Sequence, residues 1–148
     1  MPGIYLPSEY GYVLAAATST FFVNMFHSTL TSRARKASGQ KYPISYASNE
    51  LAEKDHKAYL FNCAQRAHNN FTENLTPFLG ALLISGLRYP VAAASLGAAW
   101  TVFRVVFAYG YAKKGPQGRL YGSVGASLAD FALKLMAAYT SFRFIQDV

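Results

Sequence analysis

Hydrophobic and polar residues are arranged along this chain in long blocks. The first apolar block, 10–32, has no charged side chain and is long enough to cross a bilayer as a helix, which takes about 20 mostly apolar residues. Three more such blocks follow, over 58–87, 90–112 and 120–145. The pattern predicts an all-α integral membrane four-helix bundle that occupies residues 1–148 as one domain.

The segments between these blocks contain residues that end helices. Pro90 follows a two-residue gap and opens the third block, where a helix tolerates proline well. Because that gap is so short, the second and third spans should form a tight antiparallel hairpin. The segment KKGPQGR, 113–119, ends the third span with two glycines and a proline. Small residues are dense in three of the blocks and suit close helix packing in lipid.

Basic residues are distributed unevenly between the connections. Segment 33–57 holds six Lys and Arg and segment 113–119 holds three, whereas Arg88 and Arg143 are the two expected on the opposite side. By the positive-inside rule both basic segments face the cytosol and both termini face away from it. A net charge of +7 concentrated at membrane edges does not line one soluble face, so nucleic acid is not an expected partner.

Composition excludes several classes of protein. With 52% hydrophobic and 14% charged residues, the chain is too apolar for an ordinary soluble domain of 148 residues. No Lys or Arg precedes the first span, which is longer than a signal-peptide core, so it reads as a signal anchor. The single cysteine, Cys63, rules out an internal disulfide framework. His27, His56 and His68 lack metal-ligand spacing, so no metal site is expected.

Polar residues inside the second span are the first candidates for function. Arg66, Asn70 and Glu73 are spaced i, i+4, i+7, which puts them on one helical stripe in the cytosolic half of the span. They could merely satisfy one another, but polar groups at membrane depth are usually kept for a partner or a task. Guanidiniums beside a carboxylate and an amide suit a small zwitterion that carries carboxylates and an ammonium group.

The third and fourth spans hold further candidates. Arg104 and Tyr111 lie seven residues apart on one face; Tyr109 fits an interfacial aromatic belt, whereas Tyr111 is favoured as a functional residue. Asp130 and Lys134 have the i, i+4 spacing of a self-neutralising pair. A structural ion pair is preferred there over a proton relay, since a relay needs a chain of such groups.

Two stretches resemble a known family. FNCAQRAHNNFTENLTPFL at 61–79 and RVVFAYGYAKKGPQGR at 104–119 resemble the MAPEG family, membrane-associated proteins in eicosanoid and glutathione metabolism. The likeness is greatest to the type-3 microsomal glutathione S-transferases. It implies a four-helix protomer that assembles as a homotrimer, with glutathione bound between neighbouring protomers near the cytosolic side.

The resemblance also implies roles for individual residues. It places glutathione contacts at Arg66, His68, Asn70, Glu73, Tyr111 and Arg119. It assigns thiol activation to Arg35 at the end of the first span, with Arg33 as the alternative because the alignment within RARK can shift by two residues. The chain departs from its relatives at Phe107 and Asn74, where tyrosines are found, which argues against a dedicated leukotriene synthase.

The expected function is that of a membrane-bound glutathione transferase of the endoplasmic reticulum, or alternatively of the outer mitochondrial membrane. It would conjugate the cosubstrate glutathione to hydrophobic electrophiles and reduce lipid hydroperoxides. The alternative is a non-catalytic MAPEG-like regulator that binds glutathione or lipid and a membrane partner. A transporter built on Asp130 and Lys134 is disfavoured because the chain has no internal repeat.

Overall fold

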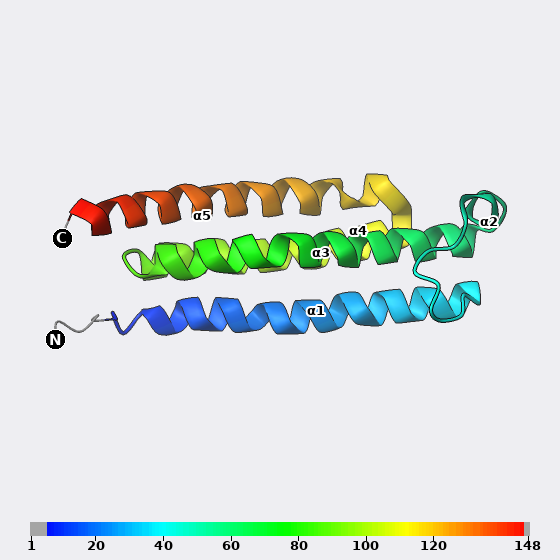
Figure 1. Ribbon diagram of the computed structural model, residues 1–148, viewed down its shortest axis with the longest axis horizontal. Coiled ribbons are helices and arrows are strands. Elements are labelled where there is room, and N and C mark those ends of the chain that lie inside the picture. The colour runs from blue at the N-terminus through cyan, green and yellow to red at the C-terminus, as the bar shows by residue number, and fades with distance from the viewer. Residues whose placement is uncertain (1–5, 147–148) are drawn as a thin grey trace.

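Four long helices run side by side in an elongated bundle (Figure 1). A computed structural model describes residues 6–146; the ends of the expected domain, 1–5 and 147–148, lie outside the described residues. The described chain is helical and contains no strand, as the sequence pattern predicts. Its elements are α1 (Tyr10–Ser38), α2 (Asn49–Lys54), α3 (His56–Gly86), α4 (Pro90–Lys114), the 3₁₀ helix η1 (Gly115–Arg119) and α5 (Leu120–Gln146).

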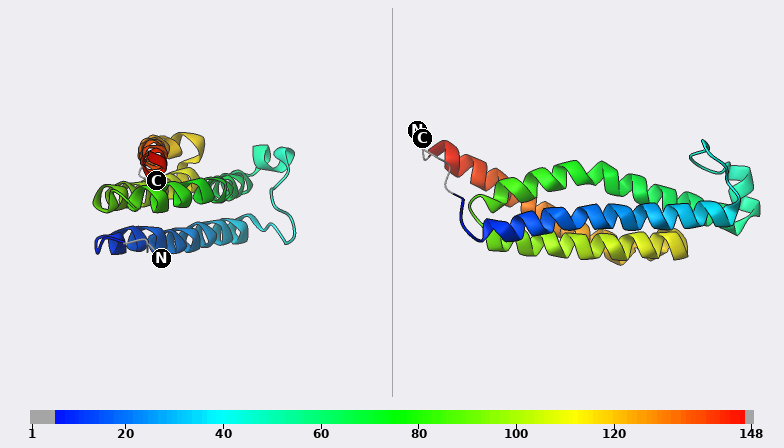
Figure 2. Two further views of the ribbon diagram at one scale, coloured as in Figure 1. Left: turned by 60° about the vertical axis from the view of Figure 1, so that its left-hand side comes forward. Right: turned by 90° about the horizontal axis from the view of Figure 1, so that it is seen from below.

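Helices α1 and α3 are longer than the apolar blocks that predict them. The C-terminal end of α1 and the N-terminal end of α3, together with α2, extend beyond the C-terminal end of α4 (Figure 2). Helix α1 continues to Ser38 because the stop signal is Gly39, which adopts a left-handed φ of 69° and donates its N–H to the carbonyl of Lys36. Helix α3 begins where the Asp55 side chain accepts a 2.9 Å hydrogen bond from the N–H of Lys57.

Both basic connections lie at the same end of the bundle. The α1–α3 connection, which includes α2, and η1 are at this end, whereas the α3–α4 turn lies at the opposite end, where α1 begins and α5 ends (Figure 1). The predicted antiparallel hairpin of the second and third spans is therefore present as α3 and α4. This arrangement has the geometry that the predicted cytosolic placement of both basic segments requires.

Aromatic stacking and close backbone approach hold the bundle together. The Trp100 ring stacks on Phe78 with centroids 3.7 Å apart, and the Phe71 ring is tilted relative to Trp100 with centroids 5.8 Å apart. Helix α5 approaches α4 so closely that a Cβ at Gly122 would clash with the Phe107 backbone. In α3, Pro77 removes the hydrogen bond that would reach the carbonyl four residues earlier, and the helix curves in Figure 2.

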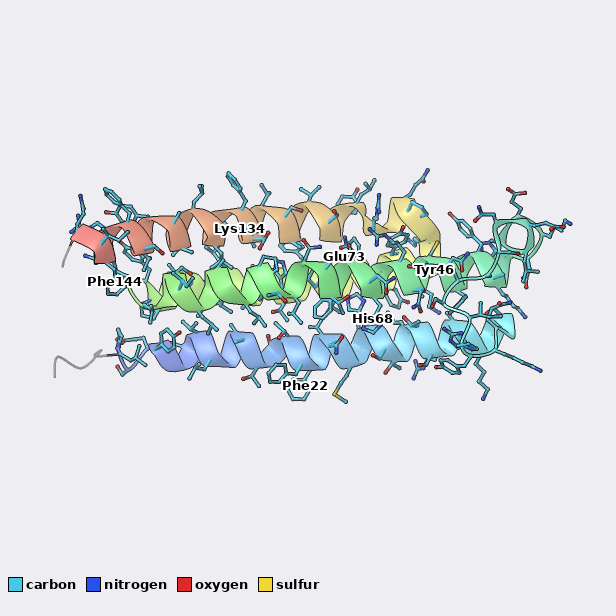
Figure 3. The ribbon with its side chains drawn as sticks, viewed as in Figure 1. Phe22, Tyr46, His68, Glu73, Lys134 and Phe144 are labelled. Carbon is cyan, nitrogen blue, oxygen red and sulfur yellow. The ribbon has the colours of Figure 1, made fainter. Side chains whose placement is uncertain are left out.

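Large apolar side chains cover the outside of the bundle. Phe22 projects away from α1 (Figure 3) and is 67% exposed, and α4 and α5 carry similar residues. Apolar surface on this scale is typical of a face that contacts lipid or another protein. Among the described residues, one helical stretch, Pro90–Gln146, is long and apolar enough to cross a membrane by length and composition, and it contains α4, η1 and α5. Crossing by α1 and α3 stays a prediction.

Candidate functional site

The stripe on α3 contains a direct ion pair. Arg66 Nη1 lies 2.8 Å from Glu73 Oε1, spanning two turns of the helix. Both side chains are about half exposed, at 47% and 54%. An accessible guanidinium beside an accessible carboxylate can exchange this mutual contact for a ligand's carboxylate and ammonium groups.

Asn70 lies on the same stripe but its side-chain oxygen is turned into the bundle. Its Oδ1 accepts a 2.9 Å hydrogen bond from Arg104 Nη1 on α4. Arg104 is only 5% exposed, and its guanidinium lies 4.4 Å from the centroid of the Phe107 ring. A guanidinium can only donate hydrogen bonds, so the atom of Asn70 that faces it must be the oxygen. The amide nitrogen of Asn70 therefore points elsewhere.

Tyr111 and Arg119 come next to this stripe through the packing of α4 and η1. Tyr111 forms a buried apolar cluster with Cys63, Ala67 and Phe107, which joins α4 to α3. The guanidinium of Arg119 lies 5.1 Å from the centroid of the Tyr111 ring. Close contact between the backbones at Gly110 and Gly118, which leaves no room for a Cβ, presses η1 against α4. Neighbouring parts of α3, α4 and η1 thus carry five of the candidate residues: Arg66, Asn70, Glu73, Tyr111 and Arg119.

His68 lies on the other side of α3. Its Nε2 is 2.9 Å from Asn24 Oδ1 on α1, and its ring is 5.6 Å from that of His27. Figure 3 shows His68 between α3 and α1, whereas Glu73 lies on the edge of α3 that faces α5. Within one protomer His68 therefore does not join the Arg66–Glu73 pair.

The two arginines at the end of α1 have different surroundings. Arg35 is 9% exposed; its Nη1 donates a 2.6 Å hydrogen bond to the carbonyl of Ile44, and its guanidinium lies over the rings of Tyr42 and Phe61 at 4.3 and 4.6 Å. Arg35 thus holds the α1–α3 connection against the helices. Arg33 is exposed and lines a groove of about 470 Å³ that Lys57 and Lys113 also line.

Asp130 and Lys134 form the ion pair that their spacing predicts, between Asp130 Oδ2 and Lys134 Nζ. Asp130 is mostly covered while Lys134 is about half exposed. Within residues 6–146 no three His, Cys, Asp or Glu side chains are grouped in a way that could hold a metal ion. His27 stacks on Phe71 with centroids 4.8 Å apart, as a packing residue does.

Comparison with known families identifies the class of protein. The chain matches the MAPEG family over residues 13–139, which is most of its length. The chain therefore belongs to the MAPEG family, whose members are membrane-associated and include glutathione transferases, peroxidases and proteins with other glutathione-related activities. The family match and the all-helical bundle agree with the fold class predicted from the apolar blocks.

Sequence reasoning assigned no role to two residues that the structure places at the α3 stripe. Arg104, which the sequence marks as a candidate on the face of Tyr111 but gives no partner, is the direct hydrogen-bond partner of Asn70. Tyr46 accepts a 2.7 Å hydrogen bond from Asn69 Nδ2 and lies in an irregular connection with no periodic pattern. No local sequence feature places Tyr46 beside α3.

Proposed function

We propose that the protein is a membrane-bound glutathione transferase that conjugates glutathione to hydrophobic electrophiles and also reduces lipid hydroperoxides. The observation that carries this proposal is the half-exposed Arg66–Glu73 pair next to Tyr111 and Arg119 in a chain of the MAPEG family. The guanidiniums suit the two carboxylates of glutathione, and Glu73 suits its ammonium group. Asn70 Nδ2 and the Tyr111 hydroxyl add neutral contacts.

The division of the candidate residues between two faces supports binding between protomers. Arg66, Asn70, Glu73, Tyr111 and Arg119 lie along α3, α4 and η1, whereas His68 and the arginines of α1 lie elsewhere on the protomer. In a homotrimer, one protomer would supply the first group and its neighbour would supply the second. The bilayer would bring the hydrophobic substrate to this cleft.

The chemistry requires the thiolate of glutathione. A free thiol has a pKa of about 8.5, so a nearby guanidinium is needed to raise the thiolate fraction at neutral pH. The thiolate sulfur then forms a bond to an electrophilic carbon, and the bond from that carbon to its leaving group breaks, so that the leaving group departs with the electron pair, as chloride does from 1-chloro-2,4-dinitrobenzene. With a hydroperoxide the thiolate attacks the terminal oxygen and the O–O bond breaks, which gives the sulfenic acid of glutathione and an alkoxide that takes a proton and leaves as the alcohol. The thiol of a second glutathione then attacks the sulfenic sulfur and releases water and the disulfide. We assign activation to Arg35, with the exposed Arg33 as the alternative.

The contacts of Arg35 also favour a second candidate function. Its Nη1 is bound to Ile44, and its guanidinium is stacked on two rings, which is what a purely structural arginine does. This observation suits a non-catalytic family member that binds glutathione or lipid and regulates a membrane partner. The two candidates share a binding site and differ in whether bound glutathione is ionised.

Turnover by the purified protein in detergent separates the candidates. The assays are conjugation of glutathione to 1-chloro-2,4-dinitrobenzene and reduction of a fatty-acid hydroperoxide. We expect both activities, with binding and turnover lost in Arg66→Ala. Glu50→Ala is the matched control, because Glu50 pairs with Lys54 at 2.7 Å on α2, away from the site. Glutathione binding without either activity would support the regulator. Absence of glutathione binding would reject the transferase and any regulator that works through glutathione, and would leave only a regulator that binds lipid.

A further inference from the structure

A small polar cavity lies between α3, α4 and α5 beside the candidate site. Its volume is about 30 Å³, and it is lined by Asn74, Trp100, Arg104, Ala126, Ser127 and Asp130. Three helices therefore contribute polar side chains to one small space. The exposed Ser127 lies at its rim, while Arg104 is buried.

Charged groups around this cavity have buried atoms without partners. Arg104 uses Nη1 to bind Asn70, but its Nε and Nη2 are buried and have no hydrogen-bond partner. Asp130 uses Oδ2 to bind Lys134, but its Oδ1 is buried and also has none. Arg104 and Asp130 carry opposite charges, and both line this cavity. Buried charged atoms are rarely left without a hydrogen bond, because losing their hydration costs free energy unless another hydrogen bond replaces it.

We propose that this cavity holds ordered water that bridges Arg104 to Asp130, and that the bridge positions Asn70. A water molecule needs about 10–15 Å³ of such space and two to four polar partners, so the cavity has room for at least one. The Arg104 N–H groups donate to the water oxygen, and the water donates to Asp130 Oδ1. Asn74 and Ser127 offer further polar atoms.

The bridge has a consequence for the surface of α3. Arg104 is held from one side by Asp130 through water and from the other by Asn70 Oδ1. Because the guanidinium accepts no hydrogen bond, Asn70 must keep its oxygen inward and its Nδ2 donor available to a ligand acceptor. Arg104 and Asp130 are thus positioning residues for Asn70. This consequence rests on the proposed glutathione site, whereas the water itself does not.

The water is tested by a structure of the full chain in detergent or a nanodisc at a resolution that shows ordered solvent. We expect density within hydrogen-bond distance of both Arg104 and Asp130 Oδ1. An empty cavity, or a direct contact between the two charged groups, would overturn the proposal. This result is independent of glutathione, so it stands or falls separately from the proposed function.

The positioning role is tested with Asp130→Asn, which removes the charge and keeps the shape. We expect the Kd for glutathione to rise about tenfold, the change that corresponds to one net hydrogen bond, with kcat changed much less. On an Asn70→Ala background the same substitution should have no further effect on Kd. A purely structural role would instead lower stability and leave the same Kd change on both backgrounds, which would overturn the assignment.

Lys134→Gln is the matched control, because it removes the other partner of Asp130 and leaves the cavity unchanged. We expect it to leave the Kd for glutathione near that of the wild type. An equal loss in both variants would mean that the outer ion pair, and not the cavity, is responsible. If Asp130→Asn does not fold, Ala126→Val tests the same point by filling the cavity, and unchanged affinity in a folded Ala126→Val protein would also overturn the role.

Discussion

Replacing Arg66 or Glu73 by alanine should reduce glutathione affinity strongly while hardly changing stability. The two side chains form a 2.8 Å ion pair but are each about half exposed. Removing one partner therefore leaves the other partly exposed on the surface of the protomer, in the cytosolic half of the span, and not enclosed within the helix bundle. Exposed pairs contribute about 0–1 kcal/mol to stability. For a chain of this size such a loss lowers Tm by only about 4 °C at most.

The effect on binding should be larger because each residue would meet a charged group of the ligand. A hydrogen bond to a charged group contributes about 1.5–3 kcal/mol. Loss of one such contact corresponds to a rise in Kd of about 10- to 150-fold. The predicted signature is thus a large change in affinity with a small change in melting temperature. A structural ion pair alone would give a small change in both.

Isothermal titration of the detergent-solubilised protein with glutathione measures the affinity, and circular dichroism measures the melt. Glu50→Ala controls for loss of an exposed ion pair elsewhere. A glutathione analogue without the ammonium group sharpens the test, because it should bind wild type and Glu73→Ala about equally. If both Arg66→Ala and Glu73→Ala keep wild-type affinity in an intact assembly, the binding assignment is wrong.

Three further predictions follow from other parts of the structure. Arg35→Ala should lower turnover more than glutathione affinity, with partial recovery of turnover at alkaline pH and reduced thiolate absorbance. It should also lower Tm, because the carbonyl of Ile44 loses its hydrogen-bond donor. Arg33→Ala should lower turnover less, and a larger loss of turnover in Arg33→Ala than in Arg35→Ala would move thiol activation to Arg33. Cysteines introduced at Ser38 and Gln146 should be labelled from opposite sides of the membrane, and labelling from one side would contradict the topology. Gly122→Leu should destabilise the bundle, measured as a fall in Tm, because a side chain there meets the α4 backbone, and an unchanged Tm would refute that close packing.

Much of the fold follows from local features of the chain. Apolar blocks predict the long helices because a helix satisfies its own backbone hydrogen bonds whatever surrounds it. Pro90 and the glycines of η1 mark where helices begin and end, and both do so in the structure. Helix α1 continues past its apolar block to Ser38 and α3 begins two residues before its block, because the caps at Gly39 and Asp55 set where these helices end and begin.

The candidate site divides in the same way. Sequence spacing was enough to predict the shared stripe of Arg66 and Glu73 and the pairing of Asp130 with Lys134, because residues on one helix have a fixed relative geometry. The assignment of Arg66, Glu73 and the other candidate residues to glutathione binding stays a prediction. The charges inside apolar blocks also indicated functional residues, because a charge at membrane depth is costly and is usually kept for a partner or a task.

Only the tertiary structure decided which of these residues contact one another across different helices. The Arg104–Asn70 hydrogen bond joins residues 34 positions apart, and no local pattern encodes it. The burial of Arg35 against Ile44 depends on the path of an irregular connection. The separation of His68 from Glu73 depends on which neighbour each face of α3 meets (Figure 3). Local periodicity determines which residues share a helix face, whereas packing between helices determines what that face contacts.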